Sequence, residues 1–250
     1  MTVPQPANHA RRRNLTIAAV AVLIVLVAAG GYGLWYLFLR PSGPAAVSSE
    51  SLALPSAAAS SPLPSGGLAG TWNVDTSIGS SSDSTDSFVG YRVQEQLASI
   101  GANTAVGRTP NVSGTLTISG TQLSAATITA DLTALASDDQ RRDGQLVSHG
   151  IETATYPTST FELTAPVDLG ADPTDGHEVD VTATGELTLH GQTKTVQIAL
   201  KARLSGSIIE VVGSLPIAFS DYGIQAPTSF VVLSVSDQGT MELQLFFTHA

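Results

Sequence analysis

Apolar and polar residues alternate along much of the chain, and the clearest example is the stretch 185–200, GELTLHGQTKTVQIAL. Two alternating runs in it flank a polar connection that contains Gly191. Because successive side chains of a β-strand point to opposite faces, Val196, Ile198 and Leu200 share one face of the second run. The stretch therefore predicts a β-hairpin with one apolar face, and the same pattern recurs from residue 70 onward.

Strand-like runs fill most of the remaining sequence. We expect strands at 71–77, 87–94, 105–108, 114–119, 123–135, 159–164, 179–189, 195–204, 208–218, 230–236 and 239–247. Many strands without a βαβ rhythm indicate an antiparallel barrel or sandwich. A barrel is favoured because closure leaves no edge strand exposed.

Two segments break the strand pattern. Residues 137–151 carry Asp138 and Asp139 near their start, followed by apolar residues at helical spacing. This pattern predicts one helix in a connection. The polar segment 94–103 is compatible with a second, short helix. The predicted fold is thus an all-β antiparallel barrel of eight or more strands with one short helix in a connection.

The charge distribution excludes some partners. The chain has a net charge of −10 and no cysteine, so it has neither disulfides nor a lipid-modified cysteine. From residue 70 onward there are seven basic and twenty acidic side chains. Such an acidic domain repels phosphate groups, so we expect no nucleic-acid partner.

An uncharged, apolar run of 25 residues, 15–39, precedes the strands. At ~1.5 Å per residue a helix of this length spans the ~30 Å apolar core of a bilayer. Arginines 11–13 precede the run and Arg40 follows it, which predicts a cytoplasmic amino terminus. A cleaved signal peptide is the alternative, although its apolar region is usually shorter. Either interpretation exports the domain.

The sequence therefore divides into four parts. We expect a cytoplasmic amino terminus (1–14), a transmembrane helix (15–39), a linker rich in Ser, Ala and Pro (40–69) and a barrel domain (70–250). The expected location is the cell membrane, with a single crossing and the barrel outside the cytoplasm. Low Lys with high Ala, Val and Thr is typical of a GC-rich bacterial genome.

Motifs of common enzyme classes are absent from the sequence. It contains no G-x-S-x-G motif and no glycine-rich phosphate loop. Its five histidines do not fall at metal-ligand spacing. We therefore expect no catalytic residues, no metal, no cofactor and no enzyme activity.

Four polar features each have a structural and a functional interpretation. The acidic loop 168–180 could bind calcium but is simpler as a solvated loop. Asp138 and Asp139 could form an acid/base pair but are more typical of a helix cap. His190 is better explained as a polar residue of a hairpin turn than as a catalytic residue. Arg142 could pair locally or contact the anionic head of a ligand, and the local pair is favoured.

Three segments together resemble the YceI-like family of lipocalin-like barrels. Segment 135–157 contains an R-D-x-x-L sequence, 185–191 reads GELTLHG, and 219–224 reads FSDYGI. Ser220 stands near a position where relatives often carry an arginine. The resemblance covers about 70–250, the whole predicted barrel domain.

The resemblance implies an eight-stranded barrel with an elongated apolar cavity for a polyisoprenoid or similar long-chain lipid. It transfers no catalytic residue. The alternation of the strands nominates the inward side chains as cavity residues: Val89, Tyr91, Val93, Leu116, Ile118, Ile128, Leu132, Phe161, Leu163, Leu187, Leu189, Val196, Ile198, Leu243, Leu245 and Phe247. Periodicity alone does not distinguish a cavity from a solid core, because the same residues would line both.

The predicted function is a membrane-anchored binding protein that holds an isoprenoid-type lipid for transport or storage. The main alternative is a protein-interaction module of the cell envelope whose solid barrel takes no ligand. A hydrolase or isomerase acting on the lipid is weaker, because no convergent set of polar residues is evident. The sequence leaves the oligomeric state open, a dimer included.

Overall fold

The computed structural model describes residues 21–31, 43–48, 67–98, 101–170, 176–227 and 232–250. The chain divides into two units, Met1–Ser42 and Gly43–Ala250. In the first unit residues 21–31 form a helix with exposed side chains. Within the described parts of the chain, no helix is both long and apolar enough to cross a membrane. The predicted membrane segment 15–39 extends beyond the described residues on both sides, so it remains a prediction.

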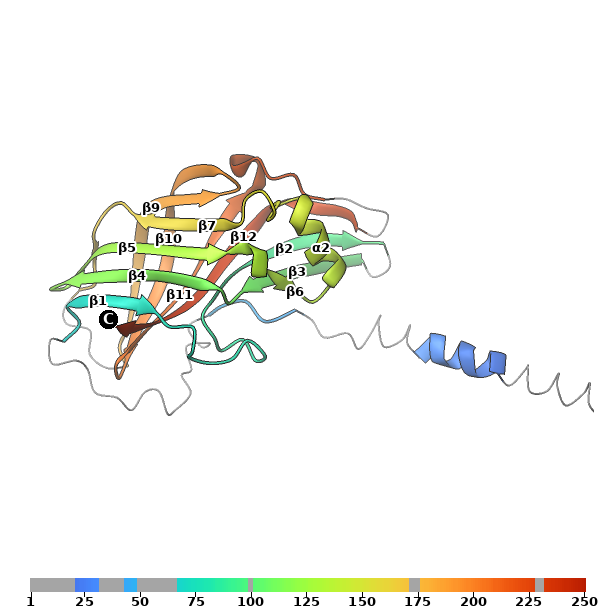
Figure 1. Ribbon diagram of the computed structural model, residues 1–250, viewed down its shortest axis with the longest axis horizontal. Coiled ribbons are helices and arrows are strands. Elements are labelled where there is room, and N and C mark those ends of the chain that lie inside the picture. The colour runs from blue at the N-terminus through green and yellow to red at the C-terminus, as the bar shows by residue number, and fades with distance from the viewer. Residues whose placement is uncertain (1–20, 32–42, 49–66, 99–100, 171–175, 228–231) are drawn as a thin grey trace, which may run out of the picture. The chain divides into compact units, whose positions relative to one another are not determined.

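Eight strands of the second unit close into an antiparallel barrel (Figure 1). Strand β1 pairs with β4 on one edge and with the end of β12 on the other, which completes the ring. The predicted eight-stranded barrel is confirmed. In ring order the strands are β1 (Gly70–Val74), β4 (Val112–Ser119), β5 (Gln122–Asp131), β7 (Thr158–Leu163), β9 (Glu178–Leu189), β10 (Gln192–Ser205), β11 (Ile208–Ala218) and β12 (Val232–His249).

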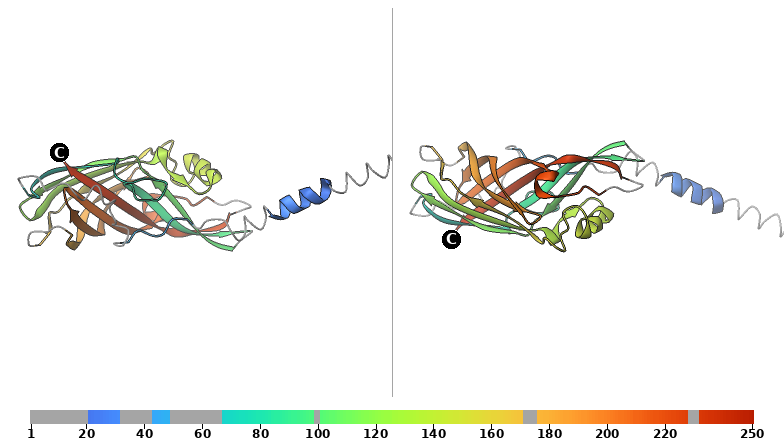
Figure 2. Two further views of the ribbon diagram at one scale, coloured as in Figure 1. Left: turned by 90° about the horizontal axis from the view of Figure 1, so that it is seen from below. Right: turned by 90° about the horizontal axis from the view of Figure 1, so that it is seen from above.

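Four short or lateral strands extend this ring. Strand β2 (Phe88–Leu97) pairs with β12, β3 (Gly101–Thr109) pairs with β2, and β6 (Ala136–Ser137) pairs with β3. Strand β8 (Val167–Asp168) pairs with β5. Strands β2 and β3 are antiparallel to each other, and both lie toward the end of the barrel that carries the helix, away from the carboxyl terminus (Figure 2).

The helix α2 (Gln140–Ser148) lies in the connection predicted to be helical. Its first turn is capped by the Asp139 side chain, which accepts a hydrogen bond from the backbone N–H of Arg141 at 2.9 Å. The capping role predicted for the acidic pair is therefore confirmed for Asp139. Two 3-10 helices, η4 (Leu132–Ala134) and η5 (Phe219–Tyr222), follow β5 and β11.

Two expectations about the secondary structure are wrong. Residues 94–98 and 101–103 are mostly strand, because β2 continues to Leu97 and β3 begins at Gly101. The two strands expected after residue 230 are the single strand β12. Its pairing with β2 shifts register between Val232 and Ser234 and again between Val235 and Gly239, so bulges carry the strand through its polar residues.

The outer face of β2, β3 and β12 is covered by other parts of the chain. Gln244 on β12 donates hydrogen bonds to the carbonyls of Ser84 and Asp86 in the loop before β2. Arg92 and Arg108 donate to the carbonyls of Pro44 and Ala45, at 2.8 and 3.0 Å. Part of the predicted linker, residues 43–48, therefore lies against the barrel wall.

Candidate functional site

The interior of the barrel is hollow. Its larger cavity, of about 130 Å³, is lined by the inward side chains of seven of the eight ring strands. Nearly all of these side chains are apolar, and the polar lining residues are Ser159, Thr160, His177 and Arg203. Burial of apolar surface is the main source of affinity in such a site, so it suits a ligand made mostly of carbon and hydrogen.

A second cavity, of about 70 Å³, is lined partly by residues from the segments on either side of α2. Its wall includes Tyr91 and Val93 of β2, Leu189 at the end of β9, and Phe219 of η5. This cavity is also lined mainly by apolar side chains. The two cavities share the lining residues Val89, Ser159 and Met241.

The structure places 15 of the 16 sequence-nominated cavity residues in the wall of one cavity or the other. In the first cavity lie Val89, Leu116, Ile118, Ile128, Phe161, Leu163, Leu187, Ile198, Leu243, Leu245 and Phe247. Tyr91, Val93, Leu132 and Leu189 line the second. The exception is Val196, which packs against the core cluster without lining either cavity.

Several lining residues are absent from the sequence-based set, and many are small. Ala126 and Ala130 of β5, Ala183 of β9 and Ala202 of β10 all line the first cavity. An alanine on an inward position fills little of the barrel, so these four residues leave space that leucine would occupy. Small inward residues in an otherwise bulky set are the sequence signal for a hollow interior. Met241 was also missed as a cavity residue.

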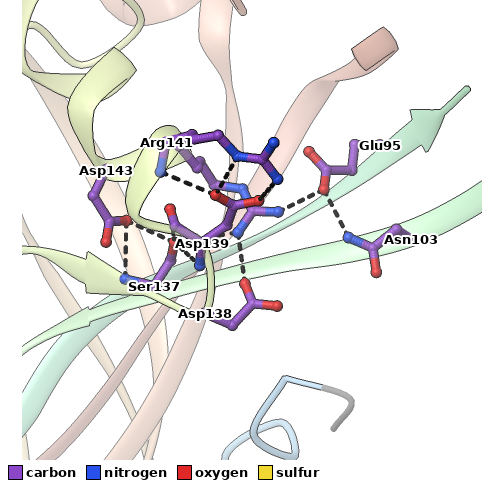
Figure 3. A network of polar contacts seen from close by, with 8 residues as sticks. Glu95, Asn103, Ser137, Asp138, Asp139, Arg141 and Asp143 are labelled. Carbon is purple, nitrogen blue, oxygen red and sulfur yellow. Dashed lines mark hydrogen bonds and ion pairs between the residues drawn. The ribbon is translucent and has the colours of Figure 1, made fainter. Parts of the chain in front are cut away.

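Arg142, nominated as a contact for a ligand head, lines neither cavity. Its guanidinium reaches from α2 to Glu95 of β2, with Nη2 2.7 Å from Oε1, and to Asp138, with Nη1 2.6 Å from Oδ1 (Figure 3). Asn103 donates a further hydrogen bond to Glu95 at 2.7 Å. Burial disfavours the charged form of Arg142, but the hydrogen bond to Asp138 and the charge of Glu95 outweigh it and raise the pKa of Arg142. The network fastens α2 to the inward face of β2.

The hydroxyl of Tyr91 lies next to this network but takes no part in it. It is buried, and no hydrogen-bond partner for it is found among the residues that the structure describes. Burial raises the pKa of Tyr91, so the hydroxyl stays protonated and able to donate. A buried donor without an acceptor is costly, which makes Tyr91 a candidate to bind a polar atom of a ligand.

His190 connects three separate segments of the chain. Together with Gly191 it forms a two-residue turn between β9 and β10, and both residues have positive φ (52° and 70°). Nδ1 of His190 lies 2.9 Å from the carbonyl oxygen of Tyr222, and Nε2 lies 2.9 Å from Oε2 of Glu152. These contacts agree with the interpretation of His190 as part of the turn architecture, and they add two long-range bonds that the turn alone does not predict.

No cluster of three or more potential metal ligands occurs in the described part of the chain. In the acidic loop considered for calcium, Asp172 and Asp175 lie outside the described residues, while Glu178 and Asp180 both pair with Lys201 at 2.8 Å. Asp168 accepts a hydrogen bond from the backbone N–H of Gly170 at 3.0 Å. The described carboxylates of this loop are therefore engaged within the protein.

Comparison with solved structures finds similar proteins. A polyisoprenoid binding domain from Saccharophagus degradans, implicated in plant cell wall breakdown, is 20% identical, with a TM-score of 0.56, and the match covers 73% of this chain and 99% of that one. BcnA from Burkholderia cenocepacia is 21% identical, with a TM-score of 0.49, and the match covers 64% and 95%. At 20% identity, the similarity to the Saccharophagus degradans domain shows a shared fold alone.

Comparison with curated protein sequences gives no match. Among protein families, the YceI-like domain matches residues 81–247, which is more than half of the chain. The match spans β2 to β12 and includes the two 3-10 helices, η4 and η5, that contribute Leu132 and Phe219 to the second cavity. On this evidence the chain belongs to the YceI-like family.

Proposed function

We propose that the barrel binds a polyisoprenoid or similar long-chain lipid and holds it for transport or storage. The observation that carries this proposal is the pair of adjoining cavities inside a closed barrel, both lined almost wholly by apolar side chains. Membership of the YceI-like family and the polyisoprenoid binding domain among proteins of this fold support the same ligand class.

The chemistry of the walls fits a ligand recognised by shape and apolar surface. Each Å² of apolar surface removed from water contributes about 25 cal/mol, so a long hydrocarbon chain needs few polar contacts. We assign the inward residues of both cavities as the contacts for this chain. For the polar head we assign Tyr91 in place of Arg142, because the guanidinium of Arg142 is directed to Glu95 and Asp138 while the hydroxyl of Tyr91 has no partner in the described chain.

We further propose that residues 15–39 anchor the protein in the cell membrane, with the amino terminus in the cytoplasm and the barrel outside it. The uncharged 25-residue run and the arginines before it support this arrangement. The described part of the run, residues 21–31, is helical. A barrel held beside a membrane has direct access to the lipids that its cavity suits.

The proposal is tested by filling the larger cavity. Ala183 of β9 is buried and lines this cavity, whereas Ala199 on the neighbouring strand β10 is exposed. Ala183→Trp should abolish binding of a polyprenol, measured as ligand-induced stabilisation of the full chain in nanodiscs, and Ala199→Trp should preserve it. Equal binding by both variants, each folded, would show that the lipid does not occupy the barrel interior.

A further inference from the structure

Three residues line both cavities and so lie where the cavities meet: Val89, Ser159 and Met241. Val89 on β2 pairs with Leu243, and Tyr91 pairs with Met241, so Val89 and Met241 are diagonal neighbours on one wall. Ser159 lies on β7, four strands away from β12 in the ring of eight, which is the opposite wall. The junction of the two cavities is therefore lined by side chains from opposite walls of the barrel.

Of the three side chains at the junction, only that of Met241 can change rotamer readily. Val89 is β-branched and has few rotamers within a strand. The hydroxyl of Ser159 is fixed, because it donates a hydrogen bond to the carbonyl of Thr188 at 3.0 Å. Met241 is unbranched, has three rotatable side-chain bonds and can change rotamer without breaking a hydrogen bond.

We propose that Met241 is a gate between two halves of one elongated ligand site and that it sets the length of lipid chain the barrel accepts. This inference rests on the proposed lipid binding. With the gate closed, a short chain whose head lies at Tyr91 fills only the second cavity, where Tyr91 pairs directly with Met241 across β2 and β12. When the methionine rotates away, a longer chain continues into the larger cavity.

Photolabelling of the full chain in nanodiscs tests the gate. The probes are geraniol and geranylgeraniol analogues that carry a diazirine at the tail, and mass spectrometry of peptides locates the label. In the native chain the tail of the short probe should label strands of the second cavity, and the tail of the long probe should label strands of the larger cavity. Met241→Trp should reduce labelling of the larger cavity by the long probe at least tenfold.

Two variants control for indirect effects of the tryptophan. Met241→Leu keeps the volume of the side chain and should retain labelling of the larger cavity by the long probe. Met241→Ala opens the junction of the cavities and should increase this labelling, whereas Leu243→Ala, two positions along β12 and in the larger cavity alone, should not.

The outcomes separate the gate from the lipid site itself. Labelling of the larger cavity by the long probe that persists in Met241→Trp would overturn the gate while leaving lipid binding intact. Absence of any labelling that unlabelled polyprenol displaces would overturn the lipid site and the gate together. Binding of long and short probes with equal labelling patterns in the native chain would also contradict a gate that selects by length.

Discussion

Arg142 of α2 and Glu95 of β2 form an ion pair across the end of the barrel, with 2.7 Å between Nη2 and Oε1. Both side chains are largely buried, at 15% and 5% exposure. The pair joins a helix to a strand 47 positions earlier in the chain, and Tyr91, four residues before Glu95 on β2, lines the second cavity. The helix α2 is thus held to β2 by charge, while the second cavity is lined mainly by apolar side chains.

Removal of one partner of this pair should be costly. Arg142→Met leaves the carboxylate of Glu95 buried without its main cation, and we expect a loss of about 3 kcal/mol in the free energy of unfolding. Arg141→Met is the matched control, because the Arg141 side chain is 73% exposed and its pair with Asp139 should contribute about 1 kcal/mol or less. Denaturant unfolding of both variants and of Arg142→Met combined with Glu95→Gln measures the difference. A loss for Arg142→Met no larger than that for Arg141→Met would contradict the structural role of the pair.

The hydroxyl of Tyr91 should matter for binding and not for folding. In both Tyr91 and Tyr222 the hydroxyl is buried without a partner among the described residues, so Tyr→Phe at either site should leave stability equal or raise it by about 1 kcal/mol. Tyr91 lines the second cavity, whereas Tyr222 lines neither of the two cavities described above. Tyr91→Phe should weaken binding of a prenyl alcohol by up to about tenfold relative to a hydrocarbon such as squalene, and Tyr222→Phe should not. Equal effects of the two variants on alcohol binding would remove Tyr91 from the site.

The stability of the barrel should depend on pH through Glu210. This residue is fully buried on β11, and burial raises the pKa of its carboxyl from 4.5 to about 7, an effect that the Arg203 guanidinium only partly offsets. Because the folded state binds this proton more tightly than the unfolded state, the contribution of Glu210 to stability is greatest below pH 4.5 and is lost as the pH rises to about 7.

Glu210→Gln should therefore remove a decrease in stability between about pH 4.5 and pH 7. Thermal unfolding across this range measures it. Glu186→Gln, the same change at an exposed position of β9, controls for the loss of one carboxylate. If the two variants differ from the native chain by the same amount at every pH, Glu210 does not titrate in this window.

Substitution of the two arginines that bind residues 43–48 should weaken the contacts of this segment with the barrel. Arg92 and Arg108 hold the carbonyls of Pro44 and Ala45, and Arg92 is also paired with Glu242 at 2.9 Å. Changing both arginines to lysine keeps the charge but loses the planar donors, so the segment should become more sensitive to proteolysis. The rate of cleavage within 43–48 is the measurement, and a rate equal to that of the native chain would show that these bonds do not hold the segment.

The barrel was predictable because the alternation of apolar and polar residues along a strand shows which side chains face inward. The alternation on β2, β9 and β12 identifies inward positions one by one, which explains why 15 of the 16 nominated residues line a cavity. The same alternation does not determine whether the inward side chains fill the barrel or leave a cavity. That outcome depends on small residues such as Ala130 and Ala183 and on the diameter of the closed ring.

Features that depend on distant contacts were not predictable from local pattern. Residues near Glu95 and Asn103 are polar enough to suggest a helix, but Glu95 is tolerated on an inward position of β2 because Arg142 neutralises its charge and Asn103 donates a hydrogen bond to it. Strand β12 continues past Asp237 because bulges absorb the irregularity. The bonds of His190 to Glu152 and Tyr222 likewise join residues more than thirty positions apart.

The most direct test of lipid binding is to identify what the barrel carries. The full chain is isolated from a bacterial membrane, exchanged into nanodiscs of a single synthetic phospholipid, and extracted with organic solvent for mass spectrometry, with Ala183→Trp treated in parallel. We predict a polyprenyl lipid recovered at about one molecule per native chain and its absence from the variant. Recovery of no such lipid, together with no uptake of added polyprenol, would contradict the account.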